Sequence, residues 1–162
     1  MERRELIRWL AATAGLPSLA FGREVHRRPL RPTLSAHVER TVTVAAERIL
    51  PGATEANVGV FIDKMLTDWH TPEERARFLG GLPELDVRGR ARAGRDFADC
   101  PEADQVAVLS TLDEEVSAAG TNDHWFARLK YLTVYGYCTS EVGMRALGLW
   151  PQAWRYDGCA PV

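Results

Sequence analysis

The apolar residues between positions 58 and 69 recur at the spacing of one face of an α-helix. They follow the series i, i+3, i+4, i+7, i+8 and i+11, namely Val58, Phe61, Ile62, Met65, Leu66 and Trp69. This period places all six side chains on the same side of a helix, where they must be covered by other parts of the chain. The segment therefore predicts an amphipathic helix that buries this face in a helical core.

Similar signals predict helices before and after this segment. Val38, Val42, Ala45 and Ile49 recur at helical intervals, with Ser35 as the predicted N-cap and Pro51-Gly52 as the stop. A second start lies at 71–74, where a capping threonine, a proline at the first helical position and a glutamate three residues after the cap form a capping box.

The second half of the chain continues the pattern. Residues 83–95 are basic and predict a short, exposed helix, and a longer helix follows Cys100-Pro101 and ends at Gly120. Asn122 or Asp123 is the predicted cap of the last long helix, and a short helix is expected after Ser140. No segment alternates strictly between apolar and polar residues, so a sheet is not expected.

The predicted fold class is therefore all-α, with five to seven helices in a single compact domain over residues 35–162. An extended N-terminal arm precedes the domain. An irregular tail, rich in aromatic residues, proline and glycine, ends it.

The N-terminus resembles a twin-arginine export signal. Arg3 and Arg4 precede an apolar run from Trp9 to Phe21, which is shorter than the roughly 20 residues of a membrane-spanning helix but suits the apolar region of a signal. We interpret residues 1–22 as the signal and residues 23–34 as a linker, and expect no transmembrane segment. The competing interpretation is an amphipathic helix that stays in the cytoplasm.

The sequence contains no pattern typical of a catalytic, metal or cofactor site. The four histidines (His26, His37, His70 and His124) lack the spacing of helical metal ligands, and there is no Cys-x-x-Cys, glycine-rich phosphate loop or Gly-x-Ser-x-Gly. A net charge of −2 gives no indication of a nucleic-acid partner. We expect no catalytic residue and no cofactor bound by this chain.

The three cysteines, Cys100, Cys138 and Cys159, leave at least one thiol without an internal partner. An intersubunit disulfide through Cys159 is one hypothesis. A free thiol, or a bridge between Cys138 and Cys159, is the alternative.

The last third of the chain is rich in tyrosine and tryptophan, which are frequent in protein interfaces and equally compatible with a core. We assign Tyr131 and Tyr135 to the core. The candidate partner interface consists of Tyr137, Thr139, Ser140, Trp150, Trp154 and Tyr156.

Several segments together resemble the gluconate 2-dehydrogenase subunit 3 family. The most specific is Lys130–Gly143, with the sequence KYLTVYGYCTSEVG. Ile49–Gly52, followed by Val60–Leu66, resembles an earlier block of that family, and Phe97–Asp99 and Tyr156–Cys159 also fit.

The resemblance implies a noncatalytic small subunit of a periplasmic sugar or sugar-acid dehydrogenase. The expected partner is a large flavoprotein subunit of the glucose-methanol-choline type that carries FAD, and many such complexes add a multihaem cytochrome c as a third subunit. The small subunit is expected to assist maturation of the flavoprotein and to take it through the twin-arginine pathway. The alternatives are a self-standing small enzyme acting on a polar molecule and a cytoplasmic helical adaptor.

Overall fold

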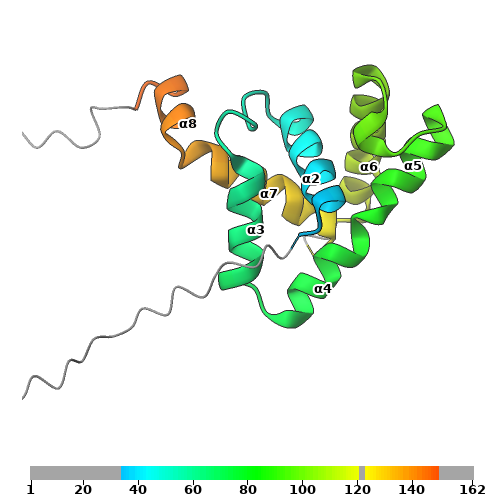
Figure 1. Cartoon of the computed structure of the whole chain (residues 1–162), viewed down its shortest axis with the longest axis horizontal. Helices are drawn as coiled ribbons and strands as arrows, with labels where there is room; N and C mark the ends of the chain where they lie inside the picture. Colours follow the sequence, from blue (N-terminus) through cyan, green and yellow to red (C-terminus); the bar gives the residue numbers. More distant parts are fainter. Residues whose placement is uncertain (1–33, 121–122, 150–162) are drawn as a thin grey trace, which may run out of the picture. The chain divides into compact units, whose positions relative to one another are not determined.

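The computed structural model describes residues 34–120 and 123–149 (Figure 1). Within these ranges the regular structure is entirely helical, which confirms the predicted all-α fold class. The elements are α2 (Ala36–Ile49), α3 (Val58–Asp68), α4 (Pro72–Gly81), α5 (Pro83–Ala93), the 3-10 helix η2 (Phe97–Asp99), α6 (Glu102–Ala119), α7 (Trp125–Cys138) and α8 (Glu141–Ala146).

Most helix starts lie where the capping residues predicted them. The Ser35 hydroxyl accepts a hydrogen bond from the backbone N–H of Val38. In the capping box of α4, Thr71 accepts from the backbone of Glu74, and the Glu74 side chain accepts from the backbone of Thr71. These side chains satisfy backbone donors that a helix start otherwise leaves unpaired.

The start of α7 differs from the prediction. Its N-cap is His124, whose Nδ1 accepts a hydrogen bond from the backbone N–H of Phe126. Asp123 instead forms an ion pair with Arg77 of α4. An imidazole nitrogen can accept a hydrogen bond as a capping oxygen does. The sequence alone therefore did not indicate that His124, and not the neighbouring Asp123, is the N-cap.

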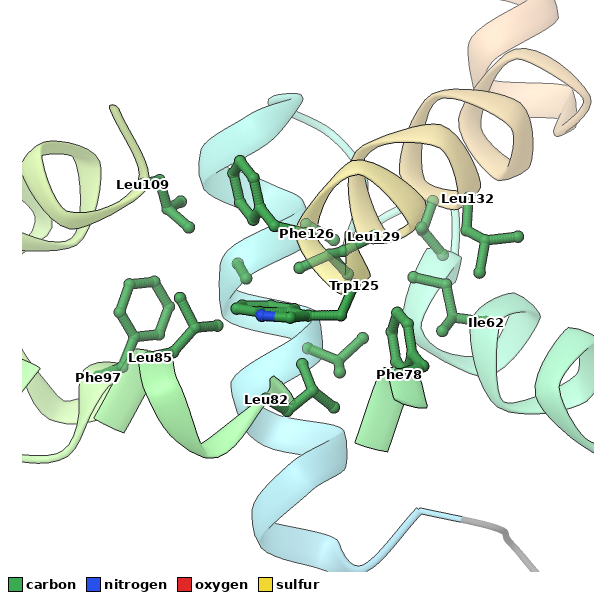
Figure 2. Packing of buried hydrophobic residues seen from close by; sticks show 14 of the residues in the cluster. Ile62, Phe78, Leu82, Leu85, Phe97, Leu109, Trp125, Phe126, Leu129 and Leu132 are labelled. Carbon is green, nitrogen blue, oxygen red and sulfur yellow. The ribbon is translucent and has the colours of Figure 1, made fainter. Parts of the chain in front are cut away.

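The buried core is built around α7, which contacts α2, α3, α4 and α6. Leu129 and Leu132 are completely buried at its centre, and Phe126 and Trp125 extend this apolar surface towards its start. Figure 2 shows the Trp125 indole in the middle of the labelled core side chains, which come from several helices. Burial of such side chains contributes roughly 1.5–3 kcal/mol each, so this cluster is the main stabilising feature of the fold.

The segment that forms α5 is less exposed than its basic composition predicted. Leu85 is completely buried and Asp86 nearly so. Gly89 packs so closely against η2 that a Cβ on it would lie 2.9 Å from the Phe97 backbone. The short helix was predicted correctly, but one of its faces is buried, because Leu85 and Gly89 are enough to pack it against η2.

None of the described helices combines the length and the apolar composition needed to cross a membrane.

Candidate functional site

Two of the predicted interface residues, Thr139 and Ser140, form the turn between α7 and α8. The Thr139 hydroxyl donates to the carbonyl of Tyr135 at 2.7 Å. The Ser140 hydroxyl donates to the carbonyl of Tyr137 at 2.7 Å and accepts from the backbone N–H of Gly143 at 3.0 Å. Both side chains therefore end one helix and begin the next, whatever else they contact in a complex.

Tyr137 is half-buried and packs against the core cluster. Its ring lies beside the turn that follows α2, where its Cε2 would be 3.2 Å from a Cβ on Gly52. Gly52 has a φ of +92°, a conformation that glycine adopts without strain. This contact joins the end of α7 to the end of α2, and leaves only part of the tyrosine ring available to a partner.

The remaining predicted site residues lie outside the described part of the chain. These are Arg3, Arg4, Trp150, Trp154, Tyr156 and Cys159. The proposed boundaries of the export signal and of the linker up to residue 34 also fall largely outside it, and stay predictions.

The two described cysteines, Cys100 and Cys138, carry free thiols. Cys100 is buried at the start of α6, and its thiol donates weakly to the carbonyls of Arg95 and Asp96. Burial raises the pKa of the Cys100 thiol, and the nearby Asp104 carboxylate adds to the rise. A thiol with a raised pKa is a poor nucleophile, so Cys100 is suited to a packing role.

Helix α7 runs beside α3 (Figure 1). The two helices carry an exposed aromatic surface that sequence reasoning missed. The rings of Tyr131 and Tyr135 are nearly parallel, with centroids 5.9 Å apart. Tyr135 also contacts Phe61 of α3 at 5.8 Å, and the Arg128 guanidinium lies 5.9 Å from the Tyr131 ring centroid. We call these four residues, Phe61, Arg128, Tyr131 and Tyr135, the aromatic strip.

The assignment of Tyr131 and Tyr135 to the core was wrong, because their side chains are 56% and 45% exposed. The buried face of α7 consists instead of Trp125, Phe126, Leu129, Leu132, Thr133 and Gly136. Trp69, which the helical period placed on the buried face of α3, is 76% exposed. It caps the C-terminus of α3, beyond the last regular turn, where the helical period no longer fixes the direction of a side chain.

Several polar groups of the aromatic strip are not engaged in hydrogen bonds with the described residues. Among the described residues, the hydroxyls of Tyr131 and Tyr135 and the guanidinium of Arg128 have no hydrogen-bond partner. The nearest carboxylate to Arg128 is Glu74, at 3.8 Å. The other oxygen of that carboxylate accepts the backbone N–H of Thr71, which is the main reason that the pKa of Glu74 is lowered. The strip thus combines exposed aromatic area with unused donors.

One group of titratable side chains outside the strip has the composition of a metal site. Atoms of His37, Asp86 and Asp96 lie within 4.8 Å of one another. His37 Nε2 is hydrogen-bonded to Asp86 at 2.7 Å, the backbone N–H of Phe97 donates to the same carboxylate, and Arg90 Nε donates to Asp96 at 2.6 Å. These bonds hold α2, α5 and η2 together, and a structural network accounts for the group.

A surface hollow of about 280 Å³ lies between α2, α6 and α7. Its floor includes Ile49, Leu109 and Phe126. Its charged groups are engaged in ion pairs: Arg48 contacts Glu102 at 2.8 Å, and Lys130 contacts Asp113 at 2.5 Å. The hollow is thus a junction of three packed helices bordered by paired charges.

At the level of architecture, the described residues define a small all-α domain that presents an aromatic surface on two adjacent helices. The model of one family, gluconate 2-dehydrogenase subunit 3, matches residues 36–158, which is most of the chain. The chain therefore belongs to the gluconate 2-dehydrogenase subunit 3 family. The name denotes a subunit of a dehydrogenase complex and so implies a larger partner subunit. No curated protein and no solved structure matches the chain.

Proposed function

We propose that this chain is the noncatalytic small subunit of a periplasmic, FAD-dependent dehydrogenase that oxidises a sugar or sugar acid. In this proposal the flavin belongs to a larger subunit of the glucose-methanol-choline type. Many such complexes add a multihaem cytochrome c as a third subunit. The small subunit assists maturation of the flavoprotein and carries it through the twin-arginine pathway. The observation that carries the proposal is the family match over residues 36–158.

Features of the chain support separate parts of the proposal. Arg3 and Arg4 before an apolar run are typical of a signal for export of folded proteins, and a folded flavoprotein is the kind of cargo that requires such a route. The aromatic strip supplies tyrosine and arginine side chains, which are enriched where protein interfaces derive most of their binding energy.

The proposal is tested by affinity purification of the full chain from its native cell extract, followed by an absorbance spectrum of the eluate. We expect a second chain of flavoprotein size and a flavin spectrum, together with dehydrogenase activity on a sugar or sugar acid. A haem spectrum in addition would identify the third subunit. A colourless eluate that contains only the 18.1 kDa chain would contradict the proposal and favour the self-standing enzyme or the adaptor.

A further inference from the structure

The most exposed residues of the aromatic strip, Tyr131 and Tyr135, do not belong to the buried core. Tyr131 and Tyr135 project from α7 on a side away from Leu129, Leu132 and Thr133, which fill the interior. Val134 lies between the two tyrosines in sequence and is 47% exposed. Apolar area of this kind remains in contact with water in the isolated chain, so covering it would be favourable.

The strip is also ordered before any partner binds. The two tyrosine rings stack on each other, Tyr135 rests on Phe61, and Arg128 lies against Tyr131. Phe61 is itself held by α7, because its ring occupies the space where a Cβ on Gly136 would be, 2.6 Å from the ring. A surface that is already fixed loses little side-chain entropy on binding, which favours affinity.

The charge of the strip indicates what should lie opposite it. The Arg128 side chain is 43% exposed, and the ion pair that it forms with Glu74 is long, at 3.8 Å, so most of its five N–H groups can accept a further partner. Stacking on an aromatic ring leaves the edge of a guanidinium free to bind a carboxylate in a bidentate manner. A complementary surface therefore presents an apolar area to the tyrosine rings and an acidic side chain to Arg128.

This requirement argues against a second copy of the chain as the occupant. In a symmetric dimer the strip would face itself, and Glu74 is the carboxylate that lies beside Arg128. That side chain is committed to the capping box of α4 through Thr71. Self-association would therefore offer Arg128 of the other copy a carboxylate that already caps α4.

We infer that the aromatic strip is the surface on which this chain binds the larger dehydrogenase subunit, through an apolar area of that subunit and a carboxylate opposite Arg128. The inference rests on the proposed function for the identity of the partner. It is independent of the predicted interface residues Tyr137, Thr139 and Ser140, which lie at the C-terminal end of α7 and in the turn that follows it.

The test is a titration of full-length variants against the larger subunit isolated from the native complex. Tyr131→Ser removes exposed ring area, and Arg128→Glu reverses the charge. Val87→Ser on α5 and Arg40→Glu on α2 are matched controls, because Val87 is also 60% exposed and Arg40 is also an exposed, carboxylate-paired arginine. Circular dichroism confirms that each variant is folded.

We expect each strip variant to weaken binding by about tenfold or more, as truncation of interface anchors does, and each control to change it by less than about threefold. A carboxylate-to-lysine change on the larger subunit that restores binding of Arg128→Glu would identify the opposing acid.

Folded strip variants that bind as tightly as the wild-type chain would overturn the inference. A dimeric chain that these variants convert to a monomer would overturn it too, in favour of self-association. Failure of the proposed function is distinguishable, since then no larger subunit would co-purify with the wild-type chain.

Discussion

The indole ring of Trp125 lies directly against the backbone of Gly81, so closely that a Cβ on Gly81 would be 2.1 Å from the ring atoms Cγ and Cδ1. The same indole donates a hydrogen bond from Nε1 to Glu84 at 3.1 Å. The ring is therefore fixed by packing on α4 and by a polar contact on α5, at the centre of the core seen in Figure 2.

We expect Gly81→Ala to lower the free energy of unfolding by about 1–3 kcal/mol, because the added methyl group forces the indole out of its place. Gly80→Ala is the matched control on the same helix, since no atom of the described part of the chain outside this helix turn lies within 4 Å of its Cβ position. There the better helix propensity of alanine should raise stability by up to about 1 kcal/mol. Urea unfolding followed by circular dichroism measures both. Equal effects at the two positions would show that the contact with Trp125 does not matter.

The buried hydroxyl of Thr133 gives a prediction of opposite sign. Its Oγ1 is completely buried on α7 and has no hydrogen-bond partner within residues 34–120 and 123–149. Thr133→Val replaces this oxygen with a methyl group of similar size, and should raise the free energy of unfolding by about 1 kcal/mol. The control is Thr41→Val on α2, where the buried hydroxyl donates to the carbonyl of His37 at 3.1 Å. That variant should be no more stable than the wild type, and thermal unfolding of the pair tests the contrast.

Glu47 should make stability depend on pH. Burial acts to raise the pKa of its carboxyl, but hydrogen bonds from the backbone N–H groups of Gly52, at 2.9 Å, and Thr54, at 2.7 Å, outweigh it and hold the pKa below its ordinary value of 4.5. A carboxyl with a lowered pKa in the folded state stabilises the fold above 4.5, and this stabilisation is lost as the pH falls through the lower, folded value.

Glu47→Gln should therefore be less stable than the wild type by about 1 kcal/mol near neutral pH. The difference should shrink as the pH is lowered below 4.5, because the wild-type carboxyl then becomes neutral as well. Urea midpoints at neutral and acidic pH measure it, with Glu55→Gln, an exposed carboxylate after the same turn, as the control. A difference that persists unchanged in acid would contradict the role of the charge.

The proposed export role predicts the behaviour of a double variant. Arg3→Lys with Arg4→Lys keeps the positive charge but removes the arginine pair, and should leave the dehydrogenase activity in the cytoplasm. Arg27→Lys with Arg28→Lys makes the same chemical change in the proposed linker and should leave export intact. Activity assays on separated periplasmic and cytoplasmic fractions decide the matter. Periplasmic activity unchanged by the first double variant would contradict the escort role.

Most helices could be predicted from the sequence because their start and stop signals act locally. Ser35, Thr71 and Ser140 cap helices through bonds to residues three positions away, and Gly120 ends α6 in the left-handed conformation. These interactions depend on a short stretch of chain, so a single sequence contains the information.

The aromatic strip could not be predicted in this way. The helical period gives α7 more apolar positions than one face can hold, and which of them face inwards depends on where α3 and α6 lie. Gly136 allows Phe61 of α3 to approach closely, so that the Phe61 ring covers this part of α7 and contacts Tyr135, which remains exposed. The exposure of Tyr131 and Tyr135 thus follows from tertiary packing, which no local pattern records.

The turn between α7 and α8 has a consequence for the placement of α8. The Ser140 hydroxyl bridges the two helices, and a Cβ on Gly143 would lie 2.0 Å from the carbonyl oxygen of Tyr137. These contacts therefore hold α8 at a fixed angle to α7 and prevent the turn from acting as a hinge. A single methyl group at position 143 would force α8 away from the end of α7, while the core around Leu129 stayed as it is.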